Sequence, residues 1–137
     1  MNKVILDQEA FGLSSLMEKI ARVRVKDCFK DEEIIYFVVA PGELGKAIGK
    51  GAINIKRAQE EFGKRIKLIE YNDEVVRFIK NIIYPAKVEE IIEENNIIFI
   101  KDSSKKTKSL LIGRGGKNLK LINRAVKRFF NKEVKVV

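Results

Sequence analysis

The sequence has no histidine and only one cysteine among its 137 residues. Without histidine, the usual sets of zinc ligands are unavailable, and Cys28 alone can form no internal disulfide. We therefore expect no metal and no cofactor. Cys28 is expected to be a small buried apolar residue.

Long apolar runs and catalytic groupings are also missing. No stretch approaches the roughly 20 apolar residues that cross a bilayer, and the first ten residues, MNKVILDQEA, lack the features of a signal peptide. These absences predict a cytoplasmic protein without a membrane partner. With no histidine, no reactive cysteine setting and no clustered catalytic carboxylates, an enzyme is not expected. The paired glutamates at 89–90 and 93–94 are typical of turns and strand edges.

What the sequence does have is an excess of positive charge, with 28 Lys and Arg against 19 Asp and Glu and a net charge of +9. Residues 101–135 hold twelve basic residues against Asp102 and Glu133. A scattered excess usually marks a solvated face. Here the charge surrounds a glycine-rich turn, which favours binding of a polyanion such as nucleic acid.

Two stretches of the chain repeat one pattern at a fixed spacing. IGKGAINIKRA begins at Ile48, and IGRGGKNLKLI begins at Ile112. The apolar positions that follow agree at the same offset, and the pairs are Ala52 with Gly116, Ile55 with Leu119, Ala58 with Ile122 and Phe62 with Val126. The repeat therefore predicts two small copies of one unit. The hydrophobic content of the chain, 45%, is enough to fill a core.

Apolar periodicity predicts the elements of the first copy. They are a helix over 6–20 with an irregular start at Gly12, strands over 23–29 and 34–39, helices over 43–48 and 52–62, and a strand over 65–69. Pro41 and Gly42 end the second strand because proline cannot donate to a ladder. Gly63 is a typical helix C-terminal glycine.

The second copy is expected to repeat this order. After a connecting helix over 73–83 and a break at Pro85, we expect strands over 86–92 and 97–100 joined by a hairpin turn through residues 93–96. A short helix over 105–112, a turn over 113–116, a long helix over 117–130 and a strand over 133–137 follow. The closing strands of the two copies align only if the second copy has four more residues before its strand than the first. The second long helix should therefore be about one turn longer than the first.

A glycine turn between two helices presents the backbone N–H groups of the second helix at its positive dipole end. Such a place suits a phosphate, and Lys50 and Arg114 each add a cation. Apolar neighbours such as Ile48 and Ile112 provide a groove for unstacked bases. The alternative is a tight connection between helices that binds no ligand.

The first turn also resembles the phosphate-binding loop of nucleotide hydrolases, but its spacing is wrong. That motif needs four residues between its glycines and a hydroxyl after the lysine. Here three residues separate Gly45 from Gly49, and Gly51 follows Lys50. Nucleotide hydrolysis is therefore not expected.

The residues at 48–52 and 112–116 resemble the I-G-x-x-G loop of KH domains. The order α-β-β-α-α-β resembles their prokaryotic, type II form, and two such units make the chain similar to archaeal NusA-like transcription factors from about residue 11 to 137. The resemblance implies an α+β fold with two tandem type II KH domains, at 1–72 and 73–137. Each would pack its helices on one face of a three-stranded sheet.

The resemblance also implies a single-stranded RNA-binding factor acting in transcription elongation, pausing or termination. Single-stranded RNA is the expected partner, RNA polymerase is a candidate partner, and we expect a monomer. The implied RNA-binding residues lie in the two loops and are Ile48, Gly49, Lys50, Gly51, Ala52, Ile112, Gly113, Arg114, Gly115, Gly116, Lys117 and Asn118. Two alternatives stay open: a KH protein of ribosome assembly or RNA processing, and a protein-interaction scaffold that binds no RNA.

The first loop departs from the family pattern at Ala52, which replaces a glycine. In a helical position, alanine favours the helix over glycine by about 1 kcal/mol, whereas in a left-handed position it costs about 1–2 kcal/mol and distorts the loop. Because Ala52 begins an apolar face, we expect it to be helical. The near-neutral charge of the first unit predicts that it binds RNA more weakly or holds the second unit in place.

Overall fold

The computed structural model describes the backbone of residues 2–137 and the side chains of residues 9–137. The chain divides between Tyr71 and Asn72 into two compact units. Each unit orders its elements as helix, two strands, two helices and a strand, which confirms the α+β class. Across the described residues, no helix has the length and apolar character that crossing a membrane requires.

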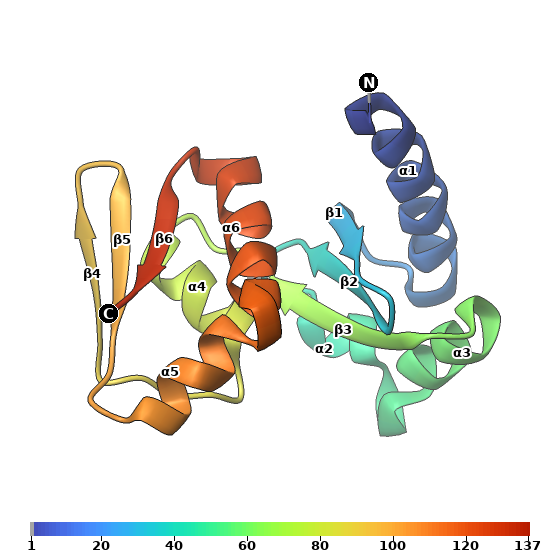
Figure 1. Ribbon diagram of the computed structural model, residues 1–137. Coiled ribbons are helices and arrows are strands. Elements are labelled where there is room, and N and C mark those ends of the chain that lie inside the picture. Colours follow the sequence, from blue (N-terminus) through green and yellow to red (C-terminus); the bar gives the residue numbers. More distant parts are fainter. Residues whose placement is uncertain (1) are drawn as a thin grey trace. The chain divides into compact units, whose positions relative to one another are not determined.

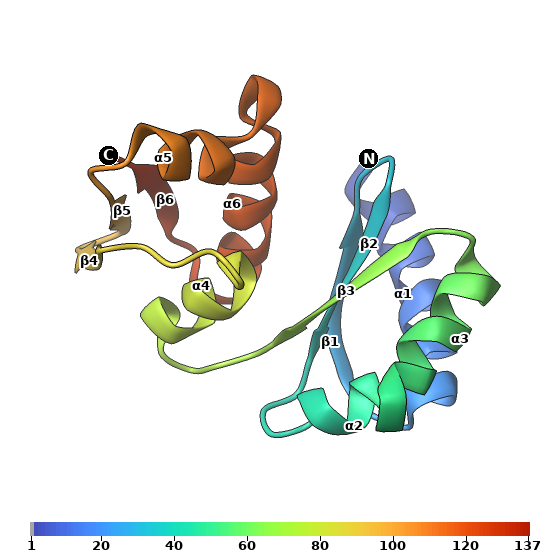
Figure 2. The same cartoon turned by 90° about the horizontal axis from the view of Figure 1, so that it is seen from below.

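The first unit packs three helices on one face of a three-stranded sheet (Figures 1 and 2). Its elements are α1 (Asn2–Ala21), β1 (Val25–Lys30), β2 (Ile34–Val39), α2 (Leu44–Ile48), α3 (Ile53–Phe62) and β3 (Arg65–Glu70). Strand β2 lies in the middle, antiparallel to β1 and parallel to β3. The core between sheet and helices includes Met17, Cys28, Phe37, Ala47 and Ala58, all nearly or fully buried. The expected burial of Cys28 is therefore confirmed.

Two local expectations for this unit need correction. Helix α1 runs through Gly12 without the irregularity that the glycine suggested. Strand β1 begins at Val25, not at residue 23. Arg22, just before the expected range, has a positive φ of 56°, and the N–H of Arg24 donates to Glu43 Oε1 and not to a neighbouring strand. The register also shifts between Val25 and Asp27. Simple alternation therefore fails here, and consecutive residues Asp27, Cys28 and Phe29 are all buried.

The second unit repeats the arrangement (Figures 1 and 2). Its elements are α4 (Val75–Ile83), β4 (Glu90–Glu94), β5 (Ile97–Lys101), α5 (Lys105–Ile112), α6 (Lys117–Phe130) and β6 (Glu133–Val136). Along β5, Ile98 and Ile100 are buried while Ile97 and Phe99, which alternate with them, are half-buried, as expected for a sheet with one covered face. Helix α4 packs on α6, where Phe78 meets Phe129 and Phe130 at ring-centroid distances of 5.7 and 5.8 Å.

Strand β4 lies later in the chain than the expected range of 86–92. Backbone N–H groups before it are used elsewhere: Ala86 donates to the carbonyl of Ile83, and Glu89 donates to Asp102 Oδ2. At its far end the strand continues to Glu94, which pairs with Ile97. The hairpin turn is therefore limited to Asn95 and Asn96.

The long helices differ in length as expected, with 10 residues in α3 and 14 in α6. Both hold the closing strand of their sheet with an amide side chain at corresponding positions. Gln59 Oε1 accepts from the N–H of Ile66 at 3.3 Å, and Asn123 Oδ1 accepts from the N–H of Val134 at 2.7 Å. The extra turn of α6 therefore lengthens the connection to β6, while the hydrogen bond from the strand to a helix amide side chain is the same in both units.

Candidate nucleic-acid interface

The first glycine loop joins α2 to α3 through a single turn. Gly49 has φ 81° and ψ 162°, Gly51 has φ 63° and ψ 24°, and Ala52 has φ 60° and ψ 28°. The N–H of Ala52 donates to the carbonyl of Gly49 at 3.0 Å. Three of the four loop residues therefore have positive φ, which turns the chain sharply before α3 begins.

The second loop, between α5 and α6, has the same backbone course. The corresponding angles are φ 75° and ψ 171° at Gly113, φ 63° and ψ 19° at Gly115, and φ 78° and ψ 13° at Gly116. The N–H of Gly116 donates to the carbonyl of Gly113 at 3.1 Å, as in the first loop. The repeated sequence therefore corresponds to a repeated loop structure.

The expectation that Ala52 is helical was wrong. It occupies the left-handed region, as Gly116 does, and α3 begins only at Ile53. The loop is not distorted, because its angles match those of the second loop. The path from α2 to α3 fixes this conformation, at a local cost of about 1–2 kcal/mol for a residue with a Cβ. The apolar face of α3 thus gave a misleading indication for its first position.

An asparagine in the first turn of the following helix bridges each loop. Asn54 Nδ2 donates to the carbonyl of Lys46 at 3.0 Å, and Asn118 Nδ2 donates to the carbonyl of Leu110 at 2.8 Å. Both carbonyls lie toward the C-terminus of the helix before the loop, where intrahelical partners run out. Asn54 and Asn118 stand at corresponding positions of the two copies, but only Asn118 was among the residues expected in the site.

The loops combine exposed cations with half-buried apolar side chains. Lys50, Arg114 and Lys117 are exposed, whereas Ile48 and Ile112 are half-buried beside them. Helices α3 and α6 both lack an acidic residue in the first turn. The positive end of each helix dipole therefore has no compensating carboxylate in the helix itself, which favours an external anion.

The structure adds residues that sequence analysis did not place in the site. Ile53, which follows the first loop, is 54% exposed, and Leu110, which precedes the second, is 61% exposed. At the corresponding positions of the other copy stand Lys117 and Lys46, also exposed. Alignment of the two copies pairs these residues, but their exposure required the structure. On α6, four further cations are exposed and extend the basic surface, namely Lys120, Arg124, Lys127 and Arg128.

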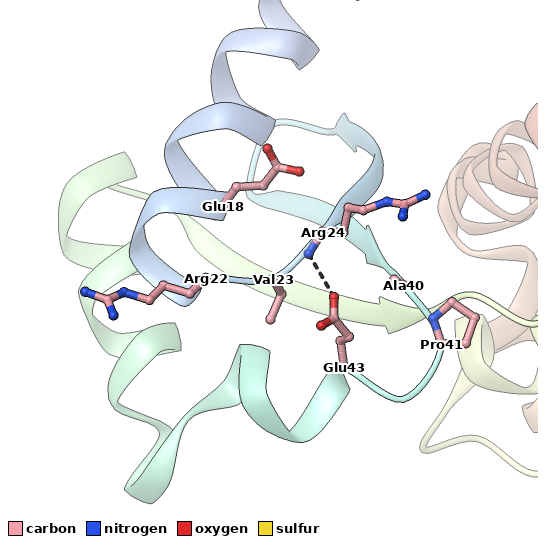
Figure 3. Close-up of a pocket in the computed structure, with 7 residues that line it drawn as sticks. All are labelled: Glu18, Arg22, Val23, Arg24, Ala40, Pro41 and Glu43. Atoms are coloured by element: carbon pink, nitrogen blue, oxygen red, sulfur yellow. Dashed lines mark hydrogen bonds between the residues drawn. The ribbon is translucent and has the colours of Figure 1, made fainter.

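A surface hollow of about 590 Å³ in the first unit lies beside the start of α2 (Figure 3). Glu43 Oε1 accepts from the N–H of Arg24, and Glu18 Oε2 accepts from the N–H of Val25, both at 2.9 Å. The side chains of Arg22 and Arg24 point away from each other (Figure 3). The carboxylates therefore hold backbone in place, and the cations do not converge on a ligand.

In a chain without histidine, acidic and cysteine side chains are the candidate metal ligands. Over the described part of the chain, no group of three or more such side chains is placed to hold a metal ion. The structural features that bear on binding are thus the two loops and the cations around them.

Comparison with known proteins gives specific relatives, although no protein-family model matches the chain. A protein of Methanocaldococcus jannaschii named "Probable transcription termination protein NusA" is 37% identical over 132 residues, which cover 93% of this chain and 72% of that protein. A protein of the same name from Thermoplasma acidophilum is 30% identical over 134 residues, which cover 96% of this chain and 93% of that protein. The crystal structure of APE1850 superposes with a TM-score of 0.74 at 32% identity, covering 95% of this chain and 99% of the other.

Proposed function

Because this chain belongs to the family of archaeal proteins named as transcription termination protein NusA, we propose that its two units are tandem type II KH domains whose glycine loops hold single-stranded RNA. The protein is a NusA-like RNA-binding factor in transcription. The proposed domains are residues 1–72 and 73–137, and this boundary lies one residue from the division between Tyr71 and Asn72. The parallel pairing of the middle and last strands in both sheets supports a common topology.

The repeated loop geometry is the observation that carries the RNA-binding proposal. Each loop brings the N-terminus of a helix of 10 or 14 residues next to an exposed cation, Lys50 or Arg114. A phosphate of the RNA backbone is the anion that fits this place. The half-buried Ile48 and Ile112 are apolar surface for the adjoining bases.

The second loop is proposed as the stronger site. It has Arg114 and Lys117 within four residues, and the exposed cations of α6 continue from it. The first loop has Lys50 and is followed by the apolar Ile53. Since phosphate contacts dominate the affinity for nucleic acids, we expect most of the binding free energy to come from the second unit.

Transcription is favoured over ribosome assembly as the process because the relatives are named for transcription termination. RNA polymerase is the proposed protein partner. Adding the purified chain to transcription by RNA polymerase from Methanocaldococcus jannaschii should change the yield of paused or terminated transcripts. Unchanged transcripts, together with co-purification with ribosomal subunits, would favour the ribosome-assembly alternative.

The RNA proposal is tested by reversing the loop charge. The double variant Arg114→Asp with Gly115→Asp should lower the affinity for labelled single-stranded RNA by at least about tenfold, measured by fluorescence anisotropy. A Cβ at Gly115 meets nothing within 4 Å, so the substitution meets only the strain of a positive φ, which aspartate adopts more readily than most residues.

The matched control is Lys50→Asp with Gly51→Asp in the first loop, where the Cβ position is also open. It should weaken binding by less. Circular dichroism confirms that both variants are folded, and duplex DNA serves as a competitor. Equal binding by the wild type and both variants would contradict RNA binding by the loops and favour the scaffold alternative.

A further inference from the structure

In each loop, the first glycine and the asparagine five residues later lie against each other. A Cβ added to Gly49 would lie 2.8 Å from Asn54 Nδ2, and one added to Gly113 would lie 2.8 Å from both Cγ and Nδ2 of Asn118. At Gly51, Gly115 and Gly116 a Cβ would meet nothing within 4 Å. The asparagine side chain therefore fills the space that only glycine leaves at the first loop position.

The same asparagine joins the two helices that flank the loop. Its amide donates to a backbone carbonyl eight residues earlier, Lys46 in α2 or Leu110 in α5. The carbonyl one residue before each of these accepts the N–H of the first loop glycine, at 3.0 Å for Gly49 and 2.8 Å for Gly113. The C-terminus of the first helix is thus held by the loop backbone and by a side chain of the second helix.

We propose that Asn54 and Asn118 are positioning residues, which hold each loop in its RNA-binding conformation before RNA arrives. This inference rests on the proposed function of the loops. Holding the loop in advance removes part of the entropy cost of binding, so the effect on affinity needs no contact with RNA. It also assigns Asn118 a role other than the direct RNA contact that the family resemblance implied.

Another asparagine of α6 provides the matched control. Asn123 Nδ2 donates to the carbonyls of Leu119 and Val134, and Asn123 Oδ1 accepts from the N–H of Val134. These bonds hold β6 and have no part in the loop. Asn123→Ala therefore removes hydrogen bonds from the same helix without removing the bridge across the glycines.

The test uses Asn118→Leu, which keeps a similar shape but cannot donate, and Asn118→Ala, which also removes the packing. Hydrogen exchange of the Gly113 and Gly116 amides is measured by NMR without RNA, and affinity for labelled single-stranded RNA is measured at several salt concentrations. Loss of one neutral hydrogen bond should accelerate exchange of these amides about five- to tenfold in Asn118→Leu. Affinity should fall severalfold with an unchanged salt dependence, because no phosphate contact is removed.

The outcomes separate this inference from the proposed function. Unchanged exchange in both Asn118 variants overturns the positioning role, whatever happens to RNA binding. Equal acceleration in Asn123→Ala also overturns it, because the effect would then be a general loss of stability. Faster exchange in the Asn118 variants alone, together with the severalfold loss of affinity, supports the positioning role. Unchanged affinity in them, while the Arg114→Asp, Gly115→Asp variant binds more weakly, overturns it. If RNA affinity is nevertheless unchanged in them and in the Arg114→Asp, Gly115→Asp variant, RNA binding by the loop fails while its positioning by Asn118 stands.

Discussion

The two units share the backbone of their glycine loops but differ in the chemistry around them. The fourth loop position is Ala52 in one and Gly116 in the other, with similar left-handed angles. The next residue is the apolar Ile53 in one and the cationic Lys117 in the other, and both are exposed. The first glycine and the asparagine are common to both. Loop shape and loop charge are therefore set by different residues and can be varied separately.

The units differ in overall charge as well. Up to Tyr71 the sequence has thirteen basic and eleven acidic residues, whereas from Asn72 on it has fifteen basic and eight acidic residues. Attraction of a polyanion should thus be much stronger at the second unit. A loop conformation maintained where the charge is low suggests that the first loop has a role other than electrostatic attraction.

The largest expected effect concerns the first glycine of each loop. Gly113→Ala should destabilise its unit by about 3 kcal/mol, because φ 75° with ψ 171° is a region essentially restricted to glycine and the new Cβ would clash with Asn118. Gly49→Ala should cost about as much, and Gly115→Ala less, since its Cβ position is open. Urea unfolding measures all three. A small effect at Gly49 alone would show that the two loops are not equivalent.

Sequence periodicity predicted most of the fold correctly. The ranges 34–39, 105–112 and 117–130 match β2, α5 and α6 residue for residue. These elements have strong apolar periodicity, and the local pattern is enough to define them. The start of strand β4 was misplaced because of contacts between residues distant in the sequence. The N–H of Glu89 donates to Asp102 Oδ2, and Glu89 Oε1 accepts from the N–H of Ser103. Such contacts leave no periodic signal in the sequence.

At the candidate site, the sequence indicated the loops but not their internal structure. The repeat located both glycine loops, while the conformation of Ala52 depends on the path between two helices. The roles of Asn54 and Asn118 depend on carbonyls eight residues earlier. The repeat puts the two asparagines at corresponding positions, but only the three-dimensional structure shows what they contact.

A second comparison concerns the middle strands, where Tyr36 in β2 and Phe99 in β5 occupy corresponding positions beside Lys67 and Lys135. Burial, together with Asp31, whose Oδ2 accepts from the Tyr36 hydroxyl at 3.2 Å, raises the pKa of Tyr36 to about 12. Between pH 10 and 12 the Tyr36 hydroxyl is deprotonated in the unfolded chain but still largely protonated in the folded protein. Stability that is fully present below pH 10 should therefore fall by about 1–2 kcal/mol across this range, after allowance for solvent screening.

Tyr36→Phe, which gives the first unit the residue of the second, should abolish this fall. Urea unfolding at pH 9, 10, 11 and 12 compares the two proteins. Burial also lowers the pKa of Lys67. The free energy of unfolding therefore increases with pH until the ordinary lysine pKa is reached. This contribution is the same in the wild type and in Tyr36→Phe. An unchanged pH profile in Tyr36→Phe would contradict the assignment to Tyr36.

Exchanging the residues at the fourth loop position should have a smaller effect. Ala52→Gly relieves the strain of a left-handed alanine but gives the unfolded chain more freedom, so we expect a net gain of about 0.5–1 kcal/mol. Gly116→Ala should lose a similar amount, since its Cβ would meet no neighbour and only the backbone angle opposes it. Thermal unfolding of the two variants measures both changes. A loss of stability in Ala52→Gly would contradict the strain inferred at this alanine.

The smallest expected effect tests whether the two loops hold RNA in the same way. Ile53→Lys places a cation after the first loop, and Lys117→Ile removes the corresponding cation after the second. Each phosphate contact with single-stranded RNA changes the slope of log affinity against log salt concentration by about 0.7. If both loops hold phosphate, the slope should steepen by this amount in Ile53→Lys and flatten by it in Lys117→Ile, with affinity changes of only a few-fold.

The double variant keeps the net charge of the chain and should restore the wild-type slope. If only Lys117→Ile changes the slope, the first loop does not contact the RNA backbone, and the shape that it shares with the second loop would favour an apolar contact through the exposed Ile53.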